Sequence, residues 1–392
     1  MKFLLTIFIY LIIVRGSMAQ INSDDIQNII EGVRSKFAPD KRTAIFNVSN
    51  KLEDKSIILL GETNLPAAKE ELLALLSKSD IVDQIDLLPS EELGEKIYGI
   101  VNLSVANIRT KPEHSAELAT QVLLGSKLKI LKSSGEWILV QCEDDYIGWI
   151  DDDGVCLMDQ QEFDNWNQSK KIIFTSPFSF SYSEENINSA PISDVVQGNI
   201  LKVLSQKNDF AKVEFPDGRI AFIPTTQVQD YEELLATRIQ SFNTINLTAQ
   251  SLMGIPYVWG GTSIKGLDCS GFTKIVFQLN GVQLPRDASQ QVHVGELVDT
   301  QNGFDNLLPG DLLFFGTKDN DSGKEKITHV AIYLGNLEFI HASGRVRINS
   351  LDKSKSNFAE GRLKTFIKAK RILTSLGNNG VKLIKDLKKN ED

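Results

Sequence analysis

Hydrophobic positions change their spacing several times along the chain, and each change predicts a different kind of element. Residues 23–37 carry apolar side chains three or four positions apart, as in a helix that buries one face. Pro66 opens a second helical pattern that continues to Leu76. Between them, residues 57–60 form an apolar run suited to a buried strand. Residues 20–93 are therefore predicted to be a small α+β module.

Short alternating segments replace the helical spacing in the middle of the chain. In residues 97–160 they follow one another at intervals of about ten residues, separated by Gly and Asp turns, and the same order returns in residues 170–230. This rhythm predicts two small β-barrels. Helical spacing resumes at Tyr231, so residues 231–374 are predicted to be a separate domain, followed by a frayed amphipathic tail at 375–392.

The N-terminus predicts export. Lys2 precedes an apolar run over residues 3–14, and residues 17–19 supply the small side chains that a signal peptidase reads. This run is shorter than the roughly 20 residues of a spanning helix. Residues 1–19 are therefore predicted to be a signal peptide, and the mature chain a soluble periplasmic or extracellular protein that does not span a membrane. A membrane-tethering anchor is the alternative.

Composition narrows the class of protein. The chain has 42 Lys and Arg against 51 Asp and Glu, a net charge of −9, which argues against nucleic acid as a partner. Three cysteines and four histidines exclude a disulfide scaffold and a zinc-finger array. Any catalytic site built from Cys and His therefore has few candidates.

Cys269 is the strongest candidate nucleophile. Asp268 is suited to cap a helix whose first turn contains Cys269. The helix dipole and the free N–H groups of that turn favour a thiolate, so the sequence predicts a lowered thiol pKa. A thiolate placed there would be a nucleophile.

Two of the histidines, His329 and His341, lie in one predicted hairpin that turns near Gly335. An odd-length or bulged turn would place both side chains on one face, and a loop centred on Gly335 would make them direct cross-strand neighbours. One imidazole is then expected to pair with Cys269 and the other to orient it. Zinc binding by the three residues is the alternative, although no fourth ligand is evident.

Several motifs occur in order around these residues. They are YVWGG at 257–261, DCSGF at 268–272, LPRDASQQ at 284–291, LPGDLLFF at 308–315 and the two-histidine hairpin. In this order they resemble the NlpC family of papain-like cell-wall cysteine peptidases, over about residues 231–373. The resemblance implies Cys269 as nucleophile, His329 as base and His341 as the orienting residue. It also implies that Tyr257 helps to stabilise the oxyanion.

The segments within 97–160 resemble bacterial SH3-like domains, and those within 170–230 resemble them less closely. With both, the chain is similar to γ-D-glutamyl-L-diamino-acid endopeptidases, which cut murein peptides that carry a free N-terminal L-Ala. The resemblance implies that the first SH3-like domain blocks one end of the cleft and helps to read the substrate amine. It implies substrate contacts by Asp268, Ser270, Asp287, Tyr146 and Glu117. The place of Glu117 can instead be occupied by Ala119.

The expected fold class is therefore α+β: a papain-like domain, with the Cys-bearing helix packed on an antiparallel sheet, preceded by two SH3-like barrels and the N-terminal module. The expected function is an exported cysteine endopeptidase that hydrolyses the γ-D-glutamyl-L-diamino-acid bond, to diaminopimelate or Lys, of peptidoglycan-derived peptides. A catalytically silent wall-binding protein and an amidase or acyltransferase on the same fold remain open alternatives.

Smaller expectations complete the sequence-based hypothesis. Neither a metal nor a cofactor is expected, and the oligomeric state is left open. Arg286 is expected to have a structural role, and Trp259 to be a core aromatic residue. Cys142 and Cys156 either form a disulfide in an oxidising compartment or remain ordinary buried thiols.

Overall fold

The computed structural model describes residues 23–53, 56–207, 209–238, 240–319 and 321–387, so the predicted signal peptide lies outside the described residues. The chain divides into two compact units. Within the described residues, the smaller unit contains 23–39 and most of 45–87, and the larger unit contains 40–44 and the chain from 88 onward. No helix in this described part combines the length and the apolar character needed to cross a membrane.

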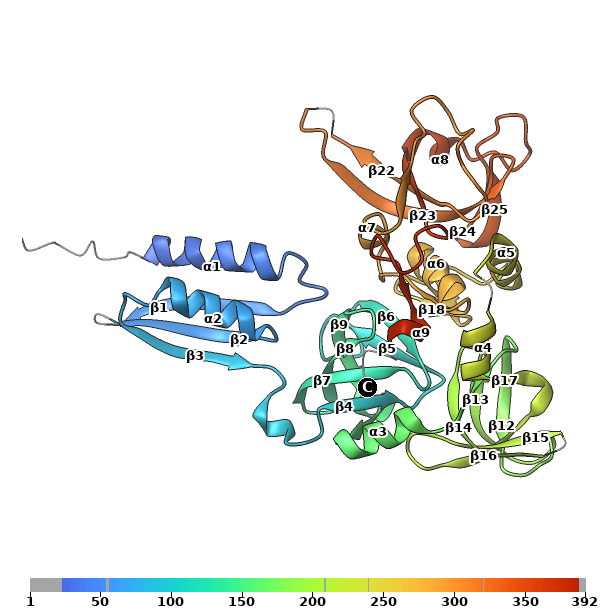
Figure 1. The fold of residues 1–392 in the computed structure, drawn as a ribbon, viewed down its shortest axis with the longest axis horizontal. Helices are drawn as coiled ribbons and strands as arrows, with labels where there is room; N and C mark the ends of the chain where they lie inside the picture. Colours follow the sequence, from blue (N-terminus) through green and yellow to red (C-terminus); the bar gives the residue numbers. More distant parts are fainter. Residues whose placement is uncertain (1–22, 54–55, 208, 239, 320, 388–392) are drawn as a thin grey trace, which may run out of the picture. The chain divides into compact units, whose positions relative to one another are not determined.

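Two helices lie against a three-stranded sheet in the smaller unit (Figure 1). The first two strands form an antiparallel hairpin, and the second helix connects the second strand to a third that runs parallel to it. Ile26, Ile30 and Leu59 are fully buried, as the apolar spacing predicts. The elements are α1 (Ser23–Phe37), β1 (Phe46–Glu53), β2 (Ser56–Thr63), α2 (Pro66–Leu75) and β3 (Ile81–Leu87).

The larger unit begins with an antiparallel sheet of seven strands in the order β10-β4-β7-β8-β9-β5-β6. Along β5 every second residue is buried (Ala106 and Ile108), which matches the pattern expected of a strand with one face in a core. Its elements are η1 (Glu91–Leu93), β4 (Tyr98–Val101), β5 (Val105–Arg109), β6 (Leu118–Leu123), β7 (Lys127–Ser134), β8 (Trp137–Cys142), β9 (Ile147–Asp151), η2 (Asp152–Gly154) and β10 (Val155–Met158).

A second seven-stranded antiparallel sheet follows, in the order β13-β12-β16-β15-β14-β11-β17. Its elements are α3 (Gln160–Gln168), which precedes it, β11 (Lys171–Phe174), β12 (Phe178–Tyr182), β13 (Pro191–Val196), β14 (Ile200–Lys207), β15 (Phe210–Glu214), β16 (Ile220–Pro224), η3 (Thr225–Gln227), β17 (Val228–Asp230) and α4 (Tyr231–Thr237). In neither sheet do the described residues record pairing between the two end strands, so closure into barrels stays a prediction.

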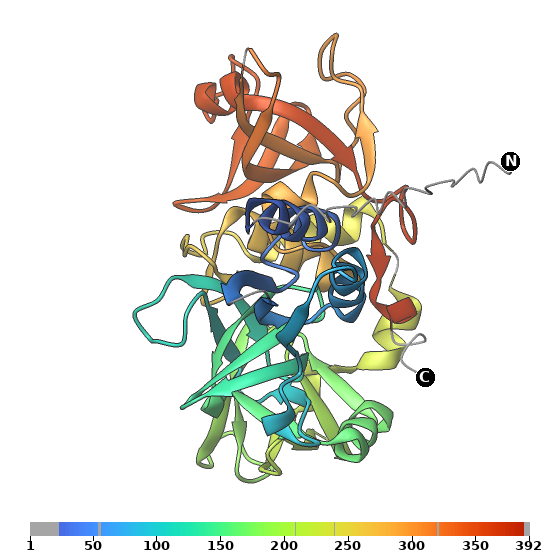
Figure 2. The same cartoon turned by 90° about the vertical axis from the view of Figure 1, so that its left-hand side faces the viewer.

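The last part of the larger unit is a six-stranded antiparallel sheet, in the order β21-β26-β22-β23-β24-β25, with helices packed on it. Figure 2 shows the yellow and light-orange helices gathered on one side of the orange and red sheet. The helix that begins at Cys269 buries Phe272, Ile275 and Val276 in the core. The predicted arrangement, an α+β domain with a Cys-bearing helix on an antiparallel sheet, is present.

The elements of this domain complete the described chain. They are α5 (Phe242–Ser251), β18 (Thr262–Ser263), β19 (Gly266–Leu267), α6 (Cys269–Gln278), β20 (Val282–Gln283), α7 (Ala288–Gln291), β21 (Glu296–Val298), β22 (Leu312–Lys318), β23 (Glu325–Gly335), β24 (Glu338–Ser343), β25 (Arg345–Ser350), α8 (Glu360–Thr365), β26 (Phe366–Arg371), β27 (Lys382–Leu383) and α9 (Ile384–Leu387).

The C-terminal tail up to residue 387 and two of the cysteines lie outside the catalytic cluster, and the structure describes both. The expectation of a frayed tail is wrong for its described part, because β27 pairs with β20 and Val381 is buried in the same core as Phe272. Cys142 and Cys156 are free thiols, so they do not form a disulfide.

Candidate active site

The start of α6 is held by a buried ion pair. The carboxylate of Asp268 accepts a hydrogen bond from the backbone N–H of Gly271 at 2.7 Å, the capping contact that the sequence predicts, and another from Gly260 at 2.9 Å. Arg286, which is fully buried, donates to both carboxylate oxygens, at 2.5 and 3.1 Å. The expected structural role of Arg286 is therefore confirmed.

Ser270 belongs to the same network. Its hydroxyl donates to Asp268 at 3.2 Å and accepts from Arg286 at 3.0 Å. Asp268 and Ser270 are both buried, and each already has partners within the protein. Their predicted contacts with substrate stay predictions, whereas their contribution to holding the nucleophile's helix is evident.

Cys269 is buried at the first position of α6. Burial and the neighbouring Asp268 carboxylate raise the pKa of its thiol to about 11, although hydrogen bonds from the backbone N–H groups of Val330 and Ser270 act in the opposite direction. The expected lowering of the thiol pKa is therefore wrong. Loss of solvent around the sulfur outweighs the helix N-terminus, and the resting nucleophile is a neutral thiol at pH 7.

The hairpin of β23 and β24 has a bulge between Tyr333 and Gly335, which confirms the predicted bulged turn. Continuing the register of the paired strands places Ala331 opposite His341, so His329 lies two residues further along its strand. The predicted direct pairing of the two histidines is therefore wrong. They still share one face of the sheet, because an offset of two residues preserves the alternation of side chains.

The two imidazoles form a hydrogen-bonded relay with a third side chain. Asn349 donates from Nδ2 to the carbonyl oxygen of Asn357 at 2.9 Å, which leaves its Oδ1 to accept from Nε2–H of His341 at 3.0 Å. His341 then has an unprotonated Nδ1, which accepts from Nε2–H of His329 at 2.7 Å. These tautomers follow from the hydrogen-bond pattern. Nδ1 of His329 therefore carries the free lone pair that can accept a proton.

Both histidines are neutral at rest. Burial, Arg362 and His341 lower the pKa of His329 well below its usual value. Burial also lowers the pKa of His341, to about 4, against the opposing effect of Asn349. No hydrogen bond from either ring to the Cys269 sulfur is recorded among the described residues. Instead the backbone of Val330, next to His329, contacts the sulfur.

Tyr257 and Arg362 lie within electrostatic range of Cys269. Burial, Cys269 and Asp268 raise the pKa of Tyr257 to about 12, so its hydroxyl keeps its proton and can donate to a developing oxyanion. Arg362 projects from α8 and influences both histidines. Sequence reasoning missed Arg362, because no motif marks its short helix.

The first seven-stranded sheet contacts the loop before Cys269. The exposed carboxylate of Glu117 accepts a hydrogen bond from the indole of Trp259 at 2.6 Å. Gly260 has a φ of +79°, and a Cβ there would lie 2.2 Å from the carbonyl oxygen of Leu118, so only glycine permits this approach. Trp259 is 64% exposed, and its expected place in a core is wrong because it lies at this contact.

A second contact involves Tyr146 and Asp287. The Tyr146 hydroxyl donates to Asp287 at 3.1 Å, and Arg42 donates to the same carboxylate oxygen at 2.6 Å and to Ser289 at 3.0 Å. Sequence reasoning missed Arg42, since nothing in residues 40–44 marks them as part of the larger unit. It also missed Asn349, although the alternation of polar residues along β25 offered a signal.

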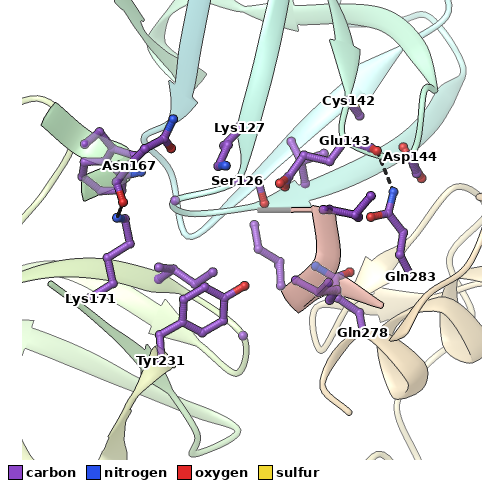
Figure 3. A pocket seen from close by; sticks show the side chains of 18 of the residues that line it. Ser126, Lys127, Cys142, Glu143, Asp144, Asn167, Lys171, Tyr231, Gln278 and Gln283 are labelled. Carbon is purple, nitrogen blue, oxygen red and sulfur yellow. Dashed lines mark hydrogen bonds between the residues drawn. The ribbon is translucent and has the colours of Figure 1, made fainter. Parts of the chain in front are cut away.

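A cavity of about 440 Å³ lies elsewhere in the larger unit (Figure 3). Lys127 and Glu143 of the first sheet's region, Lys171 of the second and Gln283 of the last domain are among its lining residues. Gln283 donates to the backbone of Glu143 at 2.6 Å across it. Cys269, His329 and His341 do not line this cavity, so it is separate from the candidate active site.

Comparisons with known proteins agree with this geometry. The NlpC/P60 family matches residues 254–361, and the bacterial dipeptidyl-peptidase Sh3 domain matches residues 108–155. A gamma-D-glutamyl-L-lysine dipeptidyl-peptidase of Bacillus cereus is 28% identical over 306 residues, covering 76% of this chain and 85% of the relative. The murein DD-endopeptidase MepS/murein LD-carboxypeptidase of Escherichia coli is 34% identical over 140 residues, 35% of this chain and 69% of the relative.

A solved structure shares the fold. The crystal structure of an NlpC/P60 family protein from Bacillus cereus has a TM-score of 0.61 and 24% sequence identity, and the similarity covers 70% of this chain and 99% of that one. The match of sequence, fold and Cys–His cluster leads to one conclusion: the chain belongs to the NlpC/P60 family and is a hydrolase of the cysteine peptidase class.

Proposed function

We propose that this protein hydrolyses the γ-D-glutamyl-L-diamino-acid bond of murein peptides that carry a free N-terminal L-Ala, after export. The observation that carries the proposal is the pair of contacts between the first seven-stranded sheet and the catalytic domain. Glu117 contacts Trp259, and Tyr146 contacts Asp287. Relatives whose names include gamma-D-glutamyl-L-lysine dipeptidyl-peptidase support the choice of bond.

The charges at these contacts suit a substrate ammonium group. Glu117 presents an exposed carboxylate. A second cluster has three carboxylates and two guanidiniums, because Asp40 and Asp287 pair with Arg42, and Asp287 and Asp268 pair with Arg286. This second cluster therefore keeps a net negative charge. A free α-ammonium forms charge-assisted hydrogen bonds with such carboxylates, whereas an acylated amine cannot. The SH3-type region would thereby select peptides with a free N-terminus over intact wall chains.

In the proposed mechanism, the thiol proton of Cys269 passes to Nδ1 of His329 as sulfur attacks the γ-carbonyl carbon. The tetrahedral oxyanion accepts hydrogen bonds from the Tyr257 hydroxyl and the Cys269 backbone N–H. His329 then returns the proton to the leaving amine, which gives a thioester. Water then attacks the thioester carbonyl carbon with His329 again as base, the C–S bond breaks to release the γ-carboxyl product, and the proton on His329 returns to the Cys269 sulfur. His341 holds the His329 ring in one orientation throughout.

The direct test is the release of L-Lys or diaminopimelate from L-Ala-γ-D-Glu-L-Lys and its diaminopimelate counterpart, followed by mass spectrometry. We expect turnover by the native protein and none by Cys269→Ala. Cys156→Ser is the matched control, because Cys156 is a free thiol on β10, away from the cluster, and should leave turnover unchanged.

The same peptides with an acetylated N-terminus test the selection for a free amine. We expect their kcat/KM to be at least tenfold lower. Turnover that survives in Cys269→Ala would contradict the nucleophile. Preference for polymeric wall over free tripeptide would contradict the proposed selection and favour an amidase.

A further inference from the structure

Arg362 lies on α8 beside the residues of the catalytic cluster. Its guanidinium carbon is 5.6 Å from the ring centre of Phe315. Phe315 is the cross-strand partner of His329, and the centres of these two rings are 5.9 Å apart. Arg362 is partly buried, and its charge is felt by both catalytic imidazoles. The cation therefore lies near the two imidazoles, on a partly buried side chain.

Arg347 adds a second cation on the same side. It is the direct cross-strand partner of His341 in the ladder of β24 and β25. Burial and the positive charge of Arg347 lower the pKa of Arg362. The groups of Cys269 and Tyr257 raise it, so all three residues lie within electrostatic range of Arg362. Two like charges thus lie near one another at the edge of the catalytic cluster.

Neither arginine has an acidic partner within the described residues. The nearby carboxylate of α8, Glu360, pairs with Lys364 at 2.9 Å. Glu325 of β23 likewise pairs with Lys368. Arg347 is exposed, so the cost of a missing counter-charge falls mainly on the partly buried Arg362, and an anion bound there would reduce it. Guanidinium groups match carboxylates in shape and charge.

We propose that Arg362, with Arg347 beside it, forms a carboxylate-binding subsite next to the imidazoles, distinct from the carboxylates of Glu117 and Asp287 that would bind the amine. This inference rests on the proposed function, because it assigns the subsite to a murein peptide. The lysine tripeptide carries two candidate carboxylates, one on the D-Glu α-carbon and one at the lysine C-terminus, and diaminopimelate adds a third on its second α-carbon. All offer the same chemistry to a guanidinium.

Substrates that lose one carboxylate at a time distinguish these sources. L-Ala-γ-D-Glu-L-Lys is compared with the peptide amidated at the D-Glu α-carboxyl and with the peptide amidated at the lysine C-terminus. We expect one amidation to lower kcat/KM of the native protein about ten- to a hundredfold, the loss typical of a missing charged hydrogen bond. Arg362→Met should have a kcat/KM for the unmodified peptide that is lower by a similar factor. It should also cleave that amidated peptide as well as the unmodified one.

Lys364→Met is the matched control, because it removes one positive charge from the same helix at an exposed position. Arg362→Lys keeps the charge and should retain part of the discrimination. Equal cleavage of all three peptides by the native protein, or undiminished discrimination by Arg362→Met, would overturn the subsite. A thermal unfolding midpoint for Arg362→Met equal to that of Lys364→Met excludes misfolding as the cause.

Calorimetric binding to Cys269→Ala and Cys269→Ala/Arg362→Met separates this inference from the proposed function. If the native protein cleaves none of the peptides but Cys269→Ala binds them with an Arg362-dependent preference for the carboxylate, the subsite stands and the proposed bond is wrong. If cleavage occurs without that preference, the bond stands and the subsite is wrong. Absence of both cleavage and binding contradicts both.

Discussion

The environment of Cys269 determines how its thiol reacts. The sulfur lies at a helix N-terminus, which favours the thiolate, but it also lies in a buried site beside the Asp268 carboxylate, which disfavours it. Burial has the larger effect, and the pKa rises to about 11. His329, the proposed base, is kept neutral by the same lack of solvent. In the proposed mechanism, Cys269 therefore loses its proton during attack rather than resting as a thiolate–imidazolium pair.

The raised pKa of Cys269 predicts how alkylation of its thiol depends on pH in the protein without substrate. Because the folded pKa lies above the ordinary value, the thiol stays protonated through neutral pH and ionises only as the pH approaches 11. The rate of Cys269 alkylation by iodoacetamide should rise about tenfold per pH unit from 7 to 10, whereas an ordinary thiol levels off near pH 9. Mass spectrometry of the Cys269 peptide measures the rate. A plateau between pH 6 and 8 would contradict the neutral thiol and indicate a preformed thiolate–imidazolium pair.

Three adjacent strands carry the proposed base and the two side chains that orient it. β23 carries His329, β24 carries His341, and β25 carries Asn349, so the register of two ladders brings the three side chains into contact. The bulge in the first hairpin shifts its register by one residue, which leaves the two histidines two residues out of register but on the same face, and their ring nitrogens meet at 2.7 Å. Asn349 then defines the tautomer of His341, and His341 that of His329.

Asn349 is therefore predicted to be a positioning residue. Asn349→Leu removes the acceptor for His341, so both rings can adopt the wrong tautomer, and kcat should fall about ten- to a hundredfold while KM changes little. Asn349→Asp keeps an acceptor oxygen and should restore most of kcat. Steady-state kinetics on the tripeptide measure both values. An equal fall in kcat for Asn349→Leu and Asn349→Asp would contradict a role in tautomer selection. A fall in kcat/KM that comes from a higher KM would contradict it as well.

In the larger unit as a whole, residues 40–44 connect the first seven-stranded sheet to the catalytic domain. The carbonyl oxygen of Arg42 accepts from the backbone N–H of Ile147 on β9, and its guanidinium donates to Asp287 and Ser289 near α7. Asp40 accepts from Gln290 at 2.8 Å. Four of the five N–H groups of the Arg42 side chain donate hydrogen bonds within the protein. Nε and Nη2 donate to Asp40, and Nη1 donates to Asp287 and to Ser289. Arg42 is therefore suited to position Asp287 rather than to bind substrate directly.

Substitution of Arg42 should weaken recognition of the free amine without affecting the chemistry. Arg42→Lys keeps the charge but cannot reach Asp40, Asp287 and Ser289 at once, so KM for the free tripeptide should rise about tenfold, with kcat within about twofold. Lys41→Ala is the control, because Lys41 is exposed in the same segment. Equal KM values for Arg42→Lys and Lys41→Ala would show that the contact with Asp287 does not contribute to recognition.

Local patterns in the sequence were enough to predict the main helices, the β-rich middle of the chain and the candidate active-site residues. Apolar spacing predicted α1 and α2, alternation predicted the β-rich middle, and Asp268 marked the start of the helix that carries Cys269. The order of short motifs pointed to the family and to the candidate triad. These inferences succeeded because helix capping, strand alternation and motif spacing depend on residues close together in sequence.

The remaining features depend on how distant segments pack. The pKa of Cys269 depends on burial, which no neighbour in sequence reveals. The contact of Asn349 with His341 depends on strand register, and those of Arg42 with Asp287 and of Arg362 with Phe315 join residues that lie apart in the chain. Solvent exclusion and long-range pairing arise only when separate elements assemble, so the folded structure was needed to find them.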